Sequence, residues 1–262
     1  MDLGISGKTA LVTGASRGIG LAVVQLLAAE GVRVVGAART SNPELEKAAV
    51  ATVQTDLATR DGATAAVEQA VAALGGLDFL VNNVGGGDPS GITIGSFLDV
   101  EDDQWRHFMD LNLYSAVWTT RAALPSLLER RGAIVNVSSI NGRVPTGSPV
   151  GYAEAKAALN QLGKRLSEEL APRGVRVNTV SPGPVSTPLW TSADSFGTKV
   201  AEAMGLSQTE MLDALPQTFG ASSGRVSTAE EVADLVAFLL SERAANVHGT
   251  DSVIDGGILK AA

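Results

Sequence analysis

Short runs of apolar, mostly β-branched residues alternate with longer helical stretches along this 262-residue chain, and this alternation constrains its fold most. The strands are expected at Thr9–Thr13, Val32–Ala37, Ala51–Gln54, Leu77–Asn82, Ala133–Val137, Val175–Val180 and Ser252–Ile254. The main helices are expected at Ile19–Glu30, Arg60–Leu74, Asp102–Arg130, Val150–Ala171 and Ala229–Leu240. Most of these strands are continuously apolar, which is typical of a sheet covered on both faces. We therefore predict an α/β fold, a Rossmann-type doubly wound sheet of about seven parallel strands with helices on both faces.

The chain is expected to form one domain over residues 1–262, because no stretch rich in Pro, Ser or charge divides it and no segment repeats. A long insertion, residues 187–225, follows the sixth strand. Ser207 and Glu210 fit a capping box that opens a helix within the insertion. An insertion at the carboxyl end of a strand in such a sheet lies beside the ligand crevice, so we interpret it as a lid over the substrate. A dimerisation or packing element is the alternative.

Composition excludes several classes of function. The net charge of −8 repels nucleic acid and anionic lipid, so neither is an expected partner. The absence of cysteine excludes disulfides, thiolate catalysis and cysteine-bound metals, and the two histidines, His107 and His248, lie far apart, so no metal site is expected. The chain has no apolar run long enough to span a membrane and no secretory signal pattern, so we expect a cytoplasmic protein.

A glycine-rich turn joins the first strand to the first helix, with Gly14, Gly18 and Gly20 in the segment TGASRGIG. Glycines at such a turn permit close approach of the backbone to a pyrophosphate. The helix that follows presents free N–H groups and the positive end of its dipole to the phosphates. This context predicts a dinucleotide site.

The end of the second strand selects the form of the dinucleotide. A protein that binds NAD usually carries an acidic residue there for the ribose hydroxyls. This chain has Arg39 and Thr40 at that place, and Arg17 stands in the glycine turn. Because guanidinium groups bind phosphate through charge-assisted bonds, we expect NADP(H) to be preferred over NAD(H).

Tyr152 and Lys156 are four residues apart and therefore share one helix face. A free tyrosine has a pKa near 10, too high for proton exchange at neutral pH, and a neighbouring ammonium group lowers it. Ser139, at the end of the fifth strand, is suited to donate a hydrogen bond that holds and polarises a carbonyl group. These three residues predict proton transfer to or from a carbonyl oxygen.

Nearly the whole chain resembles the classical short-chain dehydrogenases/reductases. The motifs that carry the resemblance, in the family's order and spacing, are TGASRGIG (13–20), Asp56-Leu57, NNVG (82–85), Asn112, Ser139, YAEAK (152–156) and SPGPVST (181–187). One departure is Val84, where the family usually carries alanine. The resemblance implies catalysis by Asn112, Ser139, Tyr152 and Lys156, with Asn112 interrupting its helix and holding a water that links Lys156 to solvent.

The same resemblance implies a cofactor site. Its residues would be Gly14, Ser16, Arg17, Gly18, Ile19, Gly20, Arg39, Thr40, Asp56, Leu57, Asn83, Gly85, Tyr152, Lys156, Pro182, Gly183, Val185 and Thr187. It also implies a homo-oligomer, a tetramer or a dimer.

The mostly apolar candidates for the substrate pocket are Asn141, Val144, Pro145, Pro184, Trp190, Phe196 and Met204. We expect an NADP-dependent oxidoreductase acting on a ketone or secondary alcohol, either 3-oxoacyl-like or a small apolar ketone. A non-catalytic NADP-binding sensor is the alternative, and loss of Tyr152 or Lys156 would have favoured it.

Overall fold

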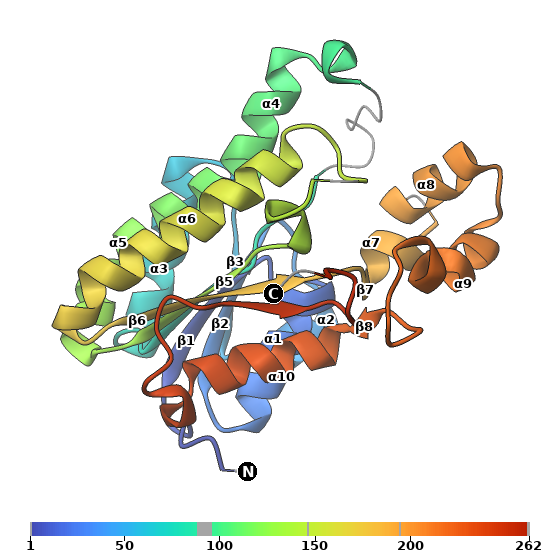
Figure 1. Cartoon of the computed structure of the whole chain (residues 1–262). Helices are drawn as coiled ribbons and strands as arrows, with labels where there is room; N and C mark the ends of the chain where they lie inside the picture. Colours follow the sequence, from blue (N-terminus) through green and yellow to red (C-terminus); the bar gives the residue numbers. More distant parts are fainter. Residues whose placement is uncertain (1, 88–95, 146, 194, 261–262) are drawn as a thin grey trace.

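A computed structural model of the chain describes residues 2–87, 96–145, 147–193 and 195–260. Within them, seven strands form one parallel sheet in the order β3-β2-β1-β4-β5-β6-β9 (Figure 1). The bounds are β1 Thr9–Thr13, β2 Arg33–Ala38, β3 Ala51–Gln54, β4 Phe79–Asn82, β5 Ala133–Val137, β6 Arg176–Pro182 and β9 Asp251–Ile254. The order reverses direction between β1 and β4, and in doubly wound sheets the ligand crevice lies outside the carboxyl ends of the strands at this switch point.

The main helices cover the two faces of the sheet. Their bounds are α1 Gly18–Ala29, α2 Pro43–Ala48, α3 Arg60–Leu74, α4 Asp102–Met109, α5 Ser115–Arg130, α6 Tyr152–Leu170 and α10 Ala229–Leu240. Helices α1 and α10 pack together on one face, and α3, α5 and α6 cover the other (Figure 1). This arrangement confirms the predicted single-domain, doubly wound α/β fold.

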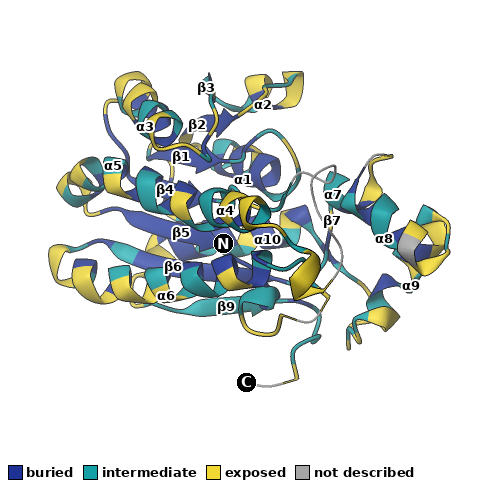
Figure 2. Ribbon diagram, turned by 90° about the horizontal axis from the view of Figure 1, so that it is seen from above, coloured by how far each residue is buried: buried dark blue, intermediate teal, exposed yellow. Residues whose placement is uncertain are grey.

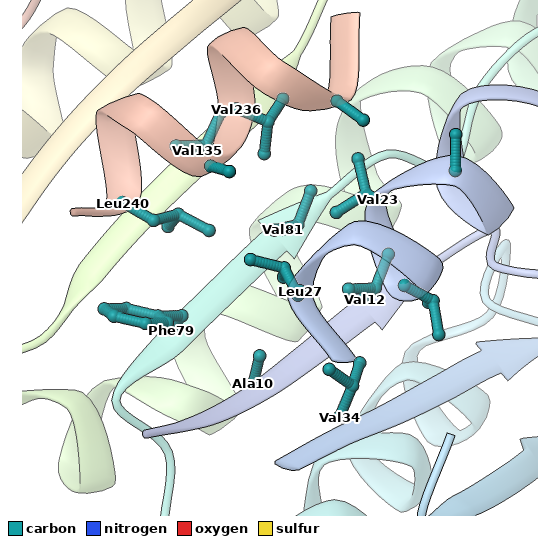
Figure 3. Packing of buried hydrophobic residues seen from close by; sticks show 14 of the residues in the cluster. Ala10, Val12, Val23, Leu27, Val34, Phe79, Val81, Val135, Val236 and Leu240 are labelled. Carbon is teal, nitrogen blue, oxygen red and sulfur yellow. The ribbon is translucent and has the colours of Figure 1, made fainter. Parts of the chain in front are cut away.

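The core consists of two apolar layers, one on each side of the sheet. Along β1, Ala10 and Val12 belong to one layer and Leu11 belongs to the other, because successive side chains of a strand point to opposite faces. The strands are accordingly the most buried part of the molecule (Figure 2). Figure 3 shows the first layer, in which side chains of α1 and α10 point toward the strands. Continuous apolar strands thus become buried on both faces.

Most predicted elements lie within two residues of their observed positions. The single helix expected over 102–130 is in fact α4, a π-helical turn at Asp110–Tyr114, and α5. The short α2, held by a cap from Asn42 to the backbone N–H of Leu45, and the two-stranded pairing of β7 (Val185–Ser186) with β8 (Ser227–Thr228) were not predicted. Such short elements carry too few residues to show a period in the sequence.

Within its described residues, 187–193 and 195–225, the insertion folds largely on itself. It contains α7 (Pro188–Thr191), α8 (Phe196–Met204) and α9 (Gln208–Thr218), and these helices stand at one end of the molecule (Figure 1). Trp190, Met211 and Leu215 are buried in a small core of their own. The predicted capping box at Ser207 is confirmed, and Thr228 forms a second one with Glu231 at the start of α10. No helix in the described part of the chain is long and apolar enough to cross a membrane.

Candidate active site

The glycine turn between β1 and α1 is shaped to hold an anion. Helix α1 begins after Arg17, which places no side-chain cap on it, so the first N–H groups of the helix have no side-chain acceptor. A Cβ at Gly20 would lie 2.2 Å from the carbonyl oxygen of Gly14, so only glycine allows this approach. Gly14 and Gly18 have positive φ angles of 65° and 55°. An uncapped helix start behind a tight turn fits the pyrophosphate of a dinucleotide.

Asn83, which follows β4, holds this turn in place through hydrogen bonds. Its Nδ2 donates to the carbonyl oxygens of Thr13, at 3.0 Å, and Gly14, at 3.2 Å. Its backbone N–H donates to the hydroxyl of Thr13 at 3.0 Å. The side chain of this predicted cofactor residue therefore fixes the loop on which a cofactor would rest.

The predicted phosphate-binding arginines lie at the ends of neighbouring strands. The backbone N–H of Ala15 donates to the carbonyl oxygen of Ala37 at 3.2 Å, which holds the glycine turn against the end of β2. Arg17, Arg39 and Thr40 are exposed there, and Ser16 is half-buried. Among the described residues, neither arginine forms an ion pair under 4.0 Å. This edge thus offers two cations without an acidic partner.

The remaining predicted cofactor residues have differing surroundings. Asp56 is exposed, and its carboxylate accepts from the backbone N–H of Ala58 at 3.0 Å, whereas the side chain of Leu57 is buried in the apolar core. A Cβ at Gly85 would lie 2.7 Å from Nζ of Lys156. Leu57 can therefore contact a cofactor only along its backbone, while Gly85 lies beside Lys156.

The segment after β6 leads from the end of the sheet toward the start of α1. The N–H of Gly183 donates to the carbonyl oxygen of Ile254 at 2.9 Å, which holds the end of β6 against the end of β9. Val185 is buried, and the methyl group of Thr187 lies 3.3 Å from where a Cβ on Gly18 would stand. The segment Pro182 to Thr187 thus runs from the end of β6 to the start of α1, where Ile19 and Gly20 also lie.

Ser139, Tyr152 and Lys156 meet at the carboxyl end of β5. Ser139 caps a short 3-10 turn by accepting from the N–H of Asn141 at 3.1 Å, and Tyr152 is the first residue of α6. Tyr152 forms a side-chain hydrogen bond with Ser139. Nζ of Lys156 lies 5.9 Å from the centre of the Tyr152 ring and donates to the carbonyl oxygen of Val137 at 3.0 Å. The predicted trio is therefore one cluster.

Burial sets the proton affinities of this cluster. It raises the pKa of Tyr152 above its ordinary value of 10.0, and the hydrogen bond with Ser139 opposes the shift by a smaller amount. Burial also lowers the pKa of Lys156 from 10.5 to about 8. The expected lowering of the pKa of Tyr152 is therefore not what this structure gives, because burial makes the net shift upward.

Asn112 lies in the π-helical turn between α4 and α5 and is fully buried, in agreement with the expected interruption of the helix. Its Nδ2 donates to the carbonyl oxygens of Gly86, at 2.9 Å, and Phe108, at 3.1 Å. Its Oδ1 accepts from the N–H of Gly86 at 2.8 Å. The side chain thus holds the loop after β4 against the π-helical turn.

A cavity of about 520 Å³ opens in front of Ser139 and Tyr152. Of the predicted pocket residues, its lining includes Asn141, Val144, Pro184, Trp190 and Phe196. Pro145 and Met204 lie outside the lining, which corrects the prediction. Pro145 is exposed in a turn closed by Ser148, whose hydroxyl donates to its carbonyl oxygen at 2.8 Å. Met204 is 45% exposed at the end of α8, because steps of four residues exceed the helical turn of 3.6 and rotate it away from Phe196.

Several wall residues were missed by sequence reasoning. They are Gly86, Gly87, Phe108, Ile140, Gly147, Ser148, Pro149, Gly183, Leu189, Val200, Thr218, Phe219, Ile258 and Leu259. Phe219 had a signal, since it ends the apolar stripe of the α9 segment. The C-terminal Ile258 and Leu259 had none, because only the fold brings the tail to the cavity.

Comparisons with known proteins agree with this geometry. Residues 14–259 match the family model described as "Enoyl-(Acyl carrier protein) reductase". The 3beta-hydroxysteroid dehydrogenase 1 of Eggerthella lenta is 34% identical, over 97% of this chain and 94% of that protein. The 3-oxoacyl-[acyl-carrier-protein] reductase FabG of Escherichia coli is 32% identical, over 98% and 99% of the two chains.

A solved structure is similar over the whole chain. L-sorbose reductase from Gluconobacter frateurii, complexed with NADPH and L-sorbose, superposes with a TM-score of 0.89, 33% identity and full coverage of both chains. The chain is therefore a member of the short-chain dehydrogenase/reductase family, an oxidoreductase that acts on CH–OH and carbonyl groups of small molecules and uses a nicotinamide cofactor.

Proposed function

We propose that this protein is an NADP(H)-preferring carbonyl reductase, or alcohol dehydrogenase in the reverse direction, whose proton donor is Tyr152. The observation that carries the proposal is the meeting of Ser139, Tyr152 and Lys156 at one end of a substrate cavity, next to the glycine turn. A non-catalytic sensor would not need this cluster.

The residues have distinct tasks in reduction. The bound cofactor supplies hydride to the carbonyl carbon. The hydroxyl groups of Ser139 and Tyr152 hold the carbonyl oxygen and stabilise the negative charge that develops on it. A tyrosine with its ordinary pKa of about 10 is already protonated at neutral pH, and burial raises the pKa of Tyr152 further, so the phenol is ready to donate its proton to that oxygen as the alcohol forms. In oxidation, Tyr152 must first lose its proton, and the phenolate oxygen then accepts the proton of the alcohol.

The chain's own residues also account for the cofactor. The uncapped start of α1 and the glycine turn would hold the pyrophosphate, and Lys156 would hold the hydroxyls of the nicotinamide ribose. Arg39 and Arg17 would hold the additional phosphate of NADP(H), since both are exposed and neither forms an ion pair within the part of the chain that the structure describes. The relative solved with NADPH supports the same preference.

Two substitutions test this proposal. NADPH and NADH oxidation are followed in parallel against a panel of ketones, quinones and 3-oxoacyl thioesters, with wild type and Tyr152→Phe. We expect turnover that prefers NADPH and falls by about 100-fold or more in Tyr152→Phe, the range of general acid catalysis. Arg39→Ala should raise the KM for NADPH and leave that for NADH nearly unchanged. Unchanged turnover in Tyr152→Phe, or equal losses with both cofactors in Arg39→Ala, would refute the corresponding assignment.

We further infer that the protein works as a homo-oligomer. Tyr114, 42% exposed at the end of the π-helical turn, stacks on Trp118 of α5 with ring centres 5.6 Å apart, and this pair forms an aromatic surface suited to a second copy. Light scattering coupled to size exclusion measures the mass directly, and a monomer of 26.8 kDa at micromolar concentration would contradict the inference.

A further inference from the structure

The cavity in front of Ser139 and Tyr152 has apolar walls drawn from distant parts of the chain. The loop after β5 contributes Val144, the insertion contributes aromatic and aliphatic side chains, and the C-terminal tail contributes Ile258 and Leu259. Among the described residues that line it, none is Asp, Glu, Lys, Arg or His. A charged substrate group would therefore lose its hydration there without gaining an opposite charge.

Apart from Ser139 and Tyr152, the polar side chains of the walls are hydrogen-bonded within the protein or exposed to solvent. Asn141 donates from Nδ2 to the carbonyl oxygen of Val144 at 3.2 Å, and the hydroxyl of Ser148 donates to the carbonyl oxygen of Pro145 at 2.8 Å. Thr218 is exposed at the end of α9. Away from Ser139 and Tyr152, the cavity thus offers few hydrogen bonds to a substrate, and a polyol would leave its hydroxyl groups unpaired.

The wall on the insertion side is aromatic and fixed. Trp190 packs edge-on against Phe196 and Phe219, with ring centres 5.4 and 6.4 Å apart. Its backbone is held by Gln208, whose Nε2 donates to the carbonyl oxygen of Trp190 at 2.8 Å. Trp190 itself is 9% exposed, in the small core of the insertion. This wall presents rigid rings rather than flexible side chains to whatever fills the cavity.

The C-terminal tail forms another part of the wall through Ile258 and Leu259. Asp255 accepts from the N–H groups of Gly257, at 2.8 Å, and Leu259, at 2.7 Å, which curls the tail. Lys260 then donates to Ser222 at 2.8 Å and ties the tail to the insertion. The two apolar parts of the wall are therefore linked to each other.

From these walls we infer that the substrate is a bulky, uncharged ketone or secondary alcohol, with a ring or branched carbon skeleton that carries few polar groups besides the reacting one. The inference rests on the proposed function for the reacting end of the cavity. The walls favour such a skeleton over a polyol or an anion, because apolar surfaces attract apolar surface and leave polar groups unsatisfied.

The first test compares carbonyl compounds of different chemistry at saturating NADPH. The probes are 1-decalone for the bulky apolar class, 2-butanone for a small ketone, L-sorbose for a polyol and acetoacetyl-CoA for an anionic thioester. We expect kcat/KM for 1-decalone to exceed that for each of the others by at least about 100-fold. A single methylene in an apolar pocket is already worth roughly 10- to 200-fold, which favours 1-decalone over 2-butanone. L-sorbose and acetoacetyl-CoA would leave polar or charged groups without partners. A higher kcat/KM for L-sorbose or acetoacetyl-CoA would overturn the inference.

A charge placed in the wall tests the same point on the protein. Val144 is 44% exposed, so Val144→Asp should fold, and we expect it to lower kcat/KM for 1-decalone by about 10-fold or more while the Kd for NADPH stays unchanged. Val50→Asp is the matched control, because Val50 is 54% exposed and lies outside the cavity lining. Equal kcat/KM for the two variants would overturn the inference.

A binding measurement separates this inference from the proposed function. Calorimetry of 1-decalone with Tyr152→Phe and NADP⁺ reports binding without turnover. Suppose that 1-decalone binds to Tyr152→Phe but that wild type turns over none of the ketones. This result would refute the proposed function and leave the inferred skeleton of the ligand standing. No binding of 1-decalone, together with turnover of L-sorbose or acetoacetyl-CoA by wild type, would refute the inferred skeleton and leave the proposed function standing.

Discussion

A methyl group at position 20 should disable the cofactor site without unfolding the protein. In Gly20→Ala, the new Cβ would lie 2.2 Å from the carbonyl oxygen of Gly14 and 2.5 Å from Nδ2 of Asn83. Real Cβ atoms essentially never approach closer than 3.0 Å, so the Gly14 carbonyl must retreat by about 0.8 Å, the difference between 3.0 and 2.2 Å. Gly14 and the start of α1 would hold the pyrophosphate, so this shift displaces the predicted binding groups themselves.

The size of the effect follows from that displacement. A misplacement of about 1 Å in a positioning group can cost on the order of 100-fold. We therefore expect the Kd for NADPH to rise by about 100-fold, which corresponds to about 2.8 kcal/mol. The assay is equilibrium titration of NADPH fluorescence, with circular dichroism to verify that the variant is folded.

Gly75→Ala is the matched control. Gly75 ends α3 with a φ of 75°, and no atom lies within 4 Å of the Cβ that alanine would add. This variant carries the strain of a left-handed residue, about 1 kcal/mol, without a steric contact and should bind NADPH like wild type. A folded Gly20→Ala whose Kd for NADPH stays within threefold of wild type would refute the reasoning that the turn requires glycine for close approach.

Three further predictions concern stability. Burial lowers the pKa of Lys156 from 10.5 to about 8, so folding disfavours the charged form of this side chain. The free energy of unfolding of wild type, relative to that of Lys156→Met, should therefore rise by about 3 kcal/mol as pH increases from about 8 to 10.5. Chemical denaturation measures this difference, and a difference that stays constant across that pH range would contradict the prediction. Asp251 accepts from Arg143, Ser181 and Asn160, so Asp251→Asn should lose about 1–3 kcal/mol in urea unfolding, and an unchanged midpoint would show that the carboxylate is dispensable. Leu27→Ala removes a fully buried side chain from the layer in Figure 3 and should cost about 2–5 kcal/mol, measured the same way; a loss under 1 kcal/mol would mean that the neighbouring side chains refill the space.

The sequence alone determines the fold class and the reacting end of the site. Continuous apolar runs of β-branched residues, separated by helical stretches, allow few arrangements other than a parallel sheet with helices on both faces. The glycine turn follows the first strand directly, and Tyr152 and Lys156 lie one helical turn apart. These features are local, so their geometry follows from backbone periods and turn sterics without knowledge of distant contacts.

Other properties depend on the tertiary structure. Only packing brings Ile258 and Leu259 of the tail into the cavity wall, assigns the side chain of Asn83 to the glycine turn, and leaves Pro145 outside the cavity lining. The direction of the Tyr152 pKa shift also depends on packing, because the loss of hydration that raises this pKa comes from neighbours in many segments. The sequence shows only the spacing between Tyr152 and Lys156. Periods and motifs report what lies within a turn or a strand, whereas burial and cavity walls are sums over contacts between residues far apart in the chain.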